Sequence, residues 1–135
     1  MEMKCHLRIA RPVSNLARTI EMYRNGLDLK IVGRFDDHEG FDGAMLGQDE
    51  MQYHFEFTYS RAHPVAPSPT KEDLVIFYIE DINAWKITCE KMISAGFKPV
   101  SSLNPYWDIG GRAFEDLDGY RVVLQNSAWI NSRIE

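Results

Sequence analysis

The sequence predicts an α+β protein built of two tandem modules, each made of a strand, a helix and further strands. The first observation is RIARPVSNL at residues 8–16, an alternating strand followed by a polar turn and a helix. The second is LVIFYIEDI at residues 74–82, where a helix again follows at once. Each half then ends in strand-like segments, MQYHFEFTY and YRVVLQ. Two half-curled sheets side by side would leave a groove, and strand alternation predicts its lining.

Size and composition restrict the class of protein. A chain of 135 residues with 44% hydrophobic and 26% charged residues is typical of one globular domain. The formal net charge of -5 offers little attraction to nucleic acid or to an anionic membrane, so we expect neither as a partner. The sequence shows no apolar run of membrane-spanning length and no signal-peptide pattern at its start. We therefore expect a cytoplasmic protein.

The chain divides at a proline-rich segment. Residues 61–72 hold three prolines without hydrophobic periodicity, which is typical of a linker. We expect a single domain over residues 1–135, with a first module at 4–60 and a second at 73–127.

The elements of the first module follow from periodicity and from helix-capping residues. We expect strand Cys5–Ala10, a helix capped by Ser14 or Asn15 and ended by Gly26, and strands Leu29–Phe35, Ala44–Leu46 and Met51–Tyr59, with DDHEGFDG as a turn-rich connection. In the last strand, Tyr53, Phe55 and Phe57 should pack under the helix, while His54 and Glu56 face the groove.

The second module repeats this plan. We expect strand Leu74–Glu80, a helix capped by Asp81 with the apolar stripe Ile82, Trp85, Cys89, Met92 and Ile93 and stopped by Gly96, strand Phe97–Ser101, a loop NPYWDIGG, and strands Arg112–Glu115 and Tyr120–Gln125. Alternation assigns Val75, Phe77 and Ile79 to the core, and Leu74, Ile76 and Tyr78 to the groove.

Side chains on the faces turned toward the helices should form the core. We expect Phe55, Phe57, Phe77 and Trp85 to be mostly buried. Cys5 and Cys89 fall at apolar-facing positions, which in a cytosolic protein indicates two buried thiols rather than a disulfide.

The segments VSNLARTIEMYRNGLDL, HFEFT, IEDINAW, AGFKPV and FEDLDGYRVVL occur in the order and spacing of a known family. With them the chain resembles the vicinal oxygen chelate superfamily, which includes glyoxalase, bleomycin-resistance and extradiol-dioxygenase proteins. The resemblance extends from about Leu7 to Leu124. It implies two βαβββ modules that form a U-shaped cleft around a ligand. Family members of this size are often homodimers, although the sequence itself does not report an oligomeric state.

The resemblance also implies where a metal ion would lie. Metal-dependent members hold a divalent ion on four residues, and these positions fall here on Arg8, Glu56, Leu74 and Val123. Only Glu56 can ligate a metal, because a guanidinium stays protonated and Leu and Val offer no lone pair. We therefore expect no metal and no other cofactor.

Two interpretations of the polar groove residues remain open. His54 and Glu56 are two residues apart on one strand, so they could act as a ligand-binding or acid–base pair. Alternatively, Glu56 only neutralises Arg8, with His54 solvated nearby. His6, His54 and Glu56 would also suit a two-histidine, one-carboxylate metal centre, although His6 lies about 7 Å along the strand from the family's position.

Aromatic and basic side chains complete the candidate ligand-binding set. Tyr78, Tyr106 and Trp107 could stack against a flat or apolar ligand, or the NPYWD segment could pack inward as loop core. Arg121 falls on the groove side of the last strand, where it could contact a ligand or be solvated.

The leading hypothesis is a metal-free protein of this superfamily that binds a small organic molecule, as in resistance or sequestration. The alternative is a metal-dependent lyase, isomerase or dioxygenase-like enzyme whose ion site is rebuilt around Glu56. A third class is an interaction module whose aromatic loop serves a protein partner.

Overall fold

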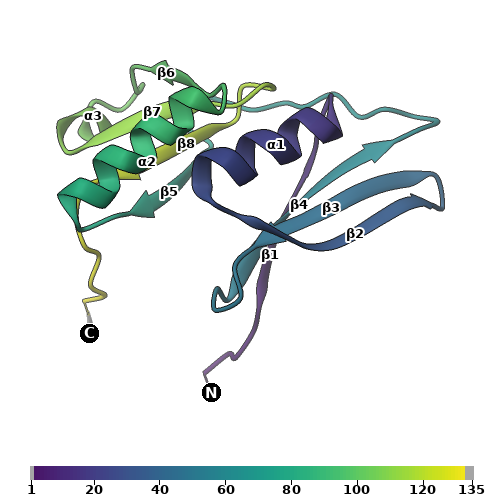
Figure 1. The fold of residues 1–135 in the computed structure, drawn as a ribbon, viewed down its shortest axis with the longest axis horizontal. Helices are drawn as coiled ribbons and strands as arrows, with labels where there is room; N and C mark the ends of the chain where they lie inside the picture. Colours follow the sequence, from purple (N-terminus) through teal and green to yellow (C-terminus); the bar gives the residue numbers. More distant parts are fainter. Residues whose placement is uncertain (1, 133–135) are drawn as a thin grey trace. The chain divides into compact units, whose positions relative to one another are not determined.

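The structure is a computed structural model that describes residues 2–132 (Figure 1). The chain separates into two compact units, with the boundary between Ser68 and Pro69. This boundary falls within the proline-containing segment that links the last strand of the first unit to the first strand of the second.

The first module is a four-stranded sheet with one helix. Its elements are β1 (Leu7–Pro12), α1 (Leu16–Leu27), β2 (Lys30–His38), β3 (Phe41–Gly47) and β4 (Tyr53–Ser60). The strand order is β1-β4-β3-β2, with β1 parallel to β4 and the other pairs antiparallel.

The second module repeats this topology. Its elements are β5 (Leu74–Tyr78), α2 (Ile82–Ser94), β6 (Lys98–Val100), α3 (Tyr106–Ile109), β7 (Gly111–Glu115) and β8 (Arg121–Gln125). Its strand order, β5-β8-β7-β6, corresponds position by position to the first sheet. The predicted α+β fold of two βαβββ modules is therefore confirmed, with the short helix α3 added to the second.

Both long helices begin at the predicted caps. Asn15 Oδ1 accepts the backbone N–H of Arg18 at 3.0 Å, and Asp81 Oδ2 accepts that of Ala84 at 2.8 Å. The prediction that Gly26 ends α1 is wrong, because the helix continues to Leu27.

The two helices end differently. Asp28 caps α1 in the left-handed region, with φ 55°. Gly96, with φ 100°, ends α2 as predicted. There the backbone N–H groups of Gly96 and Phe97 donate to the carbonyls of Ile93 and Met92 at 3.1 and 3.0 Å. These two bonds form a Schellman motif, which satisfies carbonyls at the helix end.

The core of the first module lies between α1 and the sheet. Phe55 and Phe57 are fully buried, and Tyr23 of α1 contacts both, with ring centroids 5.6 and 4.7 Å apart. The predicted face assignment of this strand is thus confirmed.

The core of the second module is less complete at its edge strand. Phe114, Val122, Leu124, Cys89 and Met92 are buried. Phe77 and Trp85, predicted to be mostly buried, are only half-buried. Phe77 is half-buried because β5 is an edge strand with no neighbouring strand on one side. The Trp85 indole N–H donates to the Leu124 carbonyl at 2.8 Å. Of the predicted stripe on α2, Ile82 and Ile93 are exposed.

Several predicted boundaries are wrong. The first strand begins two residues later than expected, at Leu7, so Cys5 precedes it and is exposed rather than buried. The segment expected as a turn-rich connection is mostly a paired hairpin between β2 and β3, turning at Glu39 and Gly40 with φ 50° and 86°. The expected loop 104–111 contains α3.

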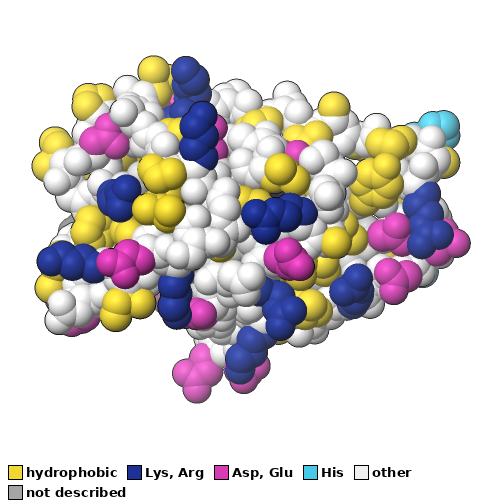
Figure 2. Space-filling model, turned by 45° about the horizontal axis from the view of Figure 1, so that its top comes forward, with side chains coloured by type: hydrophobic (Ala, Val, Ile, Leu, Met, Phe, Trp, Pro, Cys, Tyr) yellow, Lys and Arg dark blue, Asp and Glu magenta, His cyan; other side chains and the backbone are white. Residues whose placement is uncertain are grey.

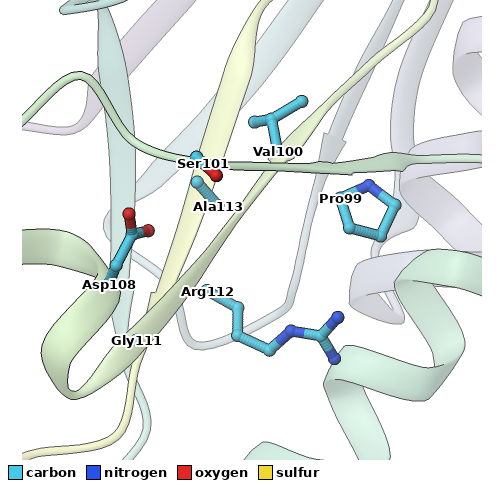
Figure 3. A pocket seen from close by; sticks show the side chains of 7 residues that line it. All are labelled: Pro99, Val100, Ser101, Asp108, Gly111, Arg112 and Ala113. Atoms are coloured by element: carbon cyan, nitrogen blue, oxygen red, sulfur yellow. The ribbon is translucent and has the colours of Figure 1, made fainter. Parts of the chain in front are cut away.

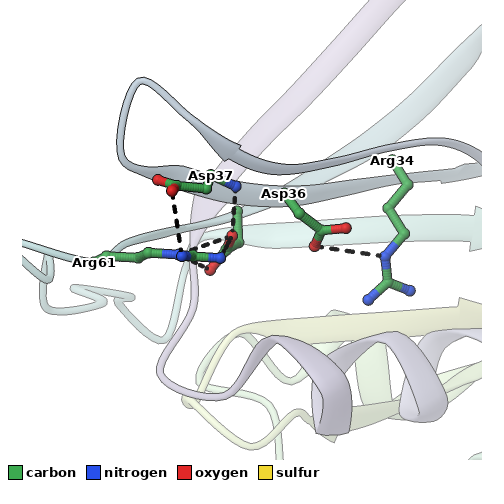
Figure 4. A network of polar contacts seen from close by, with 5 residues as sticks. Arg34, Asp36, Asp37 and Arg61 are labelled. Atoms are coloured by element: carbon green, nitrogen blue, oxygen red, sulfur yellow. Dashed lines mark hydrogen bonds and ion pairs between the residues drawn. The ribbon is translucent and has the colours of Figure 1, made fainter.

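A polar network fastens the hairpin to the start of the linker (Figure 4). The Arg61 guanidinium donates to both oxygens of Asp42, at 2.8 to 3.1 Å, and lies 3.5 Å from Asp37. Asp42 also accepts the backbone N–H of Asp37 at 2.8 Å. The guanidinium lowers the pKa of the Asp42 carboxyl, chiefly through these hydrogen bonds. The chain direction after β4 is therefore held by side chains as well as backbone.

The surface carries mixed charge. Figure 2 shows acidic and basic side chains interspersed with hydrophobic ones over the face drawn, without a continuous basic area there. Within residues 2–132, no helix is long and apolar enough to cross a membrane.

Candidate functional site

The pairing of β1 with β4 gathers the polar residues of the first module. Arg8 pairs with His54, and Glu56 follows two residues later on β4. Alternation puts these side chains on the sheet face opposite α1, since Phe55 and Phe57 contact the helix. Arg8 Nε donates to His54 Nε2 at 2.8 Å, and Arg8 Nη1 donates to Glu56 Oε2 at 3.1 Å. We call Arg8, His54, Glu56 and His6 the Arg8 centre.

His6 joins this cluster from the position just before β1. Its Nε2 lies 2.6 Å from His54 Nδ1, with the ring centroids 4.7 Å apart. A guanidinium only donates, so His54 Nε2 must be an unprotonated acceptor. The proton of a neutral His54 ring is then on Nδ1, from which it donates to His6 Nε2. The contacts form one directed chain from Arg8 through His54 to His6.

Electrostatics agree with a neutral His54. Partial burial lowers the pKa of His54 below its ordinary value, because it disfavours the charged imidazolium. The permanent positive charge of Arg8 acts in the same direction, while the negative charge of Glu56 opposes it. The direction of this shift agrees with the acceptor role of His54 Nε2.

The ion pair between Arg8 and Glu56 is asymmetric in exposure. The Arg8 side chain is 47% exposed and the Glu56 side chain 15%. Glu56 therefore partly neutralises Arg8, as one interpretation held, while the guanidinium stays open to solvent. An anionic or polar group arriving from solution can still reach it.

Gly47 lies beside this centre, and the sequence pattern did not predict a role for it. It lies on β3 beside His54, and a Cβ built there would stand 3.1 Å from the His54 Cβ. A residue with a side chain at this position would therefore require the β4 backbone at His54 to shift slightly. The signal available in the sequence was a glycine within an alternating strand, which often marks a close approach.

The corresponding positions of the second module are apolar. Leu74 pairs with Arg121, and Val123 follows two residues later on β8. This register is the one that joins Arg8 and Glu56 in the first module, so Leu74 and Val123 stand at the matching positions. Neither side chain can bind a cation.

Arg121, the remaining charged residue predicted to bind a ligand, has internal partners. Its side chain is 6% exposed. Its Nε and Nη2 atoms each lie 3.0 Å from Glu115 Oε2. Its Nη1 donates to the carbonyl of Ser101 at 3.2 Å. The structure therefore places Arg121 inside the second module rather than on its surface.

The predicted aromatic residues form two pairs in the second module. Tyr78 contacts Trp129, with ring centroids 5.8 Å apart, and both are exposed. Tyr106 meets Trp107 edge to face on α3, with centroids 4.9 Å apart. Tyr106 is exposed and Trp107 half-buried, so the turn presents one ring to solvent and packs the other partly inward.

A hollow of about 320 Å³ lies where β6 ends beside β7, and no sequence pattern indicated it. Figure 3 shows the Asp108 carboxylate near Ser101, whereas the Arg112 side chain extends away from them. Both Asp108 oxygens accept the backbone N–H of Ser102, at 3.2 and 3.1 Å. The carboxylate thus shapes the wall of this hollow.

The donor set of the Arg8 centre does not suit a metal ion. Within the described part of the chain, no group of three or more His, Cys, Asp and Glu side chains could hold one. The Glu56 carboxylate accepts a hydrogen bond from the Arg8 guanidinium. The Nε2 lone pair of His54 accepts another from the same guanidinium, so neither group is available to a metal ion.

Comparison with known proteins identifies relatives. The YycE-like N-terminal domain model matches residues 7–58, and the YycE-like C-terminal domain model matches residues 72–126. Protein YycE from Bacillus subtilis is 39% identical over 127 residues, which are 94% of this chain and 91% of that protein. The crystal structure of a Bacillus subtilis YycE protein of unknown function has a TM-score of 0.89 and covers 96% of this chain and 94% of its own.

Two more distant structures share the fold alone. Trypanothione-dependent glyoxalase I from Leishmania major is 19% identical, with a TM-score of 0.70, covering 93% of this chain and 88% of its own. TnmS3, an antibiotic binding protein from a Streptomyces species, is 15% identical, with a TM-score of 0.63, covering 93% and 97%. The fold thus carries both an enzyme and a binding protein. Together with the two domain matches, these findings place the chain in the vicinal oxygen chelate superfamily, and within it the chain belongs to the YycE-like family.

Proposed function

We propose that this protein binds a small organic molecule through an anionic or strongly polar group placed at Arg8, and that it does so without a metal ion. Its role would be binding or sequestration, as in a resistance protein. The observation that carries the proposal is the position of Arg8. A permanent, half-exposed cation stands at one of the four positions that the resemblance assigns to metal ligands.

The neighbours of Arg8 prepare it for such a group. Glu56 and His54 use the Nη1 and Nε donors and so orient the guanidinium plane. A planar guanidinium held in this way suits two-point recognition of a carboxylate, phosphonate or similar oxyanion. The aromatic side chains Tyr78, Tyr106 and Trp107 remain candidates for stacking against a flat or apolar ligand within the second module.

The residues present argue against a resident metal. Bringing a divalent cation beside Arg8 is electrostatically unfavourable, and a single carboxylate does not hold a transition metal tightly. The chemistry of the donor set, rather than the resemblance, supports a metal-free site.

Metal content tests this part of the proposal. Protein purified without chelator should carry far less than one equivalent of Zn, Ni, Mn or Fe, and EDTA should leave its melting temperature unchanged. Elemental analysis and thermal denaturation measure both. Stoichiometric metal that disappears in Glu56→Gln would overturn the metal-free site.

Ligand binding tests the other part. A thermal-shift screen of small molecules with an aromatic body and an oxyanion should find compounds whose effect is weakened in Arg8→Ala. Arg34→Ala is the matched control, because Arg34 is an exposed arginine of the same module at the other edge of the sheet, where its ion pair is with Asp36. Equal binding by the wild type and Arg8→Ala would place the site elsewhere.

A metal-dependent enzyme of the glyoxalase type remains the second candidate. The observation that favours it is the contact of His6 with His54, which brings two imidazoles and the Glu56 carboxylate to one face. This arrangement would require Arg8 to withdraw so that His54 Nε2 becomes free. If the elemental analysis finds metal, His6 and His54 are the next ligands to replace.

A cytoplasmic location and a homodimer also remain proposals, which fractionation and sedimentation would test.

A further inference from the structure

The turn that carries Tyr106 and Trp107 has little regular structure to hold it. Pairing of β6 with β7 ends at Val100 and Ala113, and α3 has four residues. We call residues 101–109 the aromatic turn. Backbone bonds within it are local, such as Trp107 N–H to the Asn104 carbonyl at 3.2 Å. The end of the turn is held by the pairing of Gly111 with Gln125 and by the Asn126 N–H bond to the Gly110 carbonyl at 2.8 Å, so the position of its first residues depends on other contacts.

Two side chains contact the first residues of the turn, one from the sheet and one from within the turn. Arg121 Nη1 donates to the Ser101 carbonyl at 3.2 Å, from β8. The Asp108 carboxylate accepts the backbone N–H of Ser102, which closes the turn on itself. Arg121 thus anchors the start of the turn to β8, and Asp108 ties the turn internally.

The Arg121 anchor is itself rigid. Glu115 on the neighbouring strand β7 pairs with Arg121 in register and binds Nε and Nη2, each at 3.0 Å. The guanidinium therefore presents Nη1 in one direction only. A lysine could not hold Glu115 by two donors and reach the Ser101 carbonyl with a third in the same fixed geometry.

Stability alone is a weak reason for this arrangement. Replacing a buried ion pair by apolar residues of similar volume is often neutral or stabilising. Direct contact between Arg121 and a ligand is also disfavoured, since the side chain is 6% exposed and its donors are engaged within the module.

We propose that Arg121 is a positioning residue, which acts through the Ser101 carbonyl to set where the aromatic turn presents Tyr106 and Trp107. The role of those two side chains in binding rests on the proposed function. The position of the turn does not, and it can be measured without any ligand.

The experiment follows Trp107 by ¹⁹F NMR of protein labelled with 5-fluorotryptophan. The three resonances, from Trp85, Trp107 and Trp129, are assigned with single Trp→Phe variants. Arg121→Lys and Glu115→Gln should each shift or broaden the Trp107 resonance and leave that of Trp85 in place. Arg112→Lys is the control, because Arg112 lies on β7 beside the same hollow yet points away from the turn.

Two outcomes would overturn the proposal. A Trp107 resonance that stays in place in both folded variants overturns the proposal. Loss of dispersion of all three resonances in both variants also overturns it, because Arg121 would then be required for the fold as a whole.

A second readout connects the turn to binding. The probe is 8-anilinonaphthalene-1-sulfonate, which has a flat aromatic body and an anionic sulfonate. Its fluorescence titration should show Trp107→Ala and Arg121→Lys each weakening affinity about 2- to 10-fold, as loss of one aromatic contact predicts. The double variant should be no weaker than Trp107→Ala alone.

The two proposals fail in different ways. If Arg121→Lys moves the Trp107 resonance while no variant changes probe affinity, the aromatic turn is positioned as inferred but the proposed binding role fails. If Trp107→Ala weakens the probe and Arg121→Lys changes neither resonance nor affinity, the positioning inference fails alone.

Discussion

The two modules share one topology but place an arginine in it differently. In the first, Arg8 on the edge strand β1 reaches across to His54 and Glu56 of β4 and remains 47% exposed. In the second, the edge strand supplies Leu74, and the arginine sits instead on the inner strand β8 as Arg121, 6% exposed. The same cation is therefore accessible in one module and internal in the other.

This difference in exposure is the basis of the two roles that we propose, ligand binding for Arg8 and positioning for Arg121. An arginine on an edge strand keeps one side open to solvent, so its charge can meet a ligand. An arginine on an inner strand is enclosed by its neighbours and needs a partner, which Glu115 provides. The proposed roles therefore differ because of burial and not because of residue type.

The largest expected effect on the free energy of unfolding distinguishes the core of the first module from that of the second. Phe55→Ala should lower the free energy of unfolding by about 3–5 kcal/mol, because Phe55 is fully buried under α1. Phe77→Ala, at a half-buried position of the edge strand β5, should lower it by less than about 3 kcal/mol. Urea unfolding measures both. Equal losses would mean that the second core is as complete as the first.

Breaking the internal ion pair should come next. Arg121→Met leaves Glu115 without its partner and should lower the free energy of unfolding by about 2–4 kcal/mol, below the usual range because Glu115 is 26% exposed. The double variant Arg121→Met with Glu115→Leu should recover most of the loss. A single variant as stable as the wild type would contradict the assignment of Arg121 to the interior.

Helix caps should contribute equally in the two modules. Asn15→Ala and Asp81→Ala each remove an acceptor from the first turn and should each lower the free energy of unfolding by about 1 kcal/mol. Asp81→Asn retains the acceptor and is the control. A tenfold stronger effect of one cap than of the other on the unfolding equilibrium would contradict their equal contribution.

The accessible arginine should matter little for stability. Arg8→Ala removes a half-exposed ion pair and should change the free energy of unfolding by less than about 1 kcal/mol, in contrast to Arg121→Met. Thermal and urea unfolding of the two variants side by side measure this contrast. A large loss in Arg8→Ala would mean that the Arg8 centre is structural.

The smallest effect is the pH dependence of the Arg8 centre. The pKa of His54 is lower in the folded protein than its unfolded value of about 6.5, so the unfolded chain binds the proton more readily. The resulting stability is present above the unfolded pKa and is lost as the pH falls through the folded pKa. Unfolding at pH 5.5 and 7.5 should show a smaller difference in His54→Gln than in the wild type. An unchanged difference would mean that His54 does not titrate as inferred.

Local sequence patterns determined much of the fold. The two capped helices, the alternation that buries Phe55 and exposes His54, and the doubling of the module all depend on residues close in the chain. Short-range spacing sets which face each side chain takes, because the periods of helix and strand are properties of the backbone. Family membership followed from the same patterns.

Tertiary structure decided the rest. Three features each join residues that are not neighbours in the sequence: the contact of His6 with His54, the enclosure of Arg121, and the place of Gly47 beside His54. Such contacts depend on register between strands distant in sequence, and a shift of one residue would turn every side chain to the other face. The sequence alone determined that Arg8 and Arg121 would lie on the same kind of face. Only the tertiary contacts left Arg8 half-exposed and enclosed Arg121, because they depend on the partners that neighbouring strands supply.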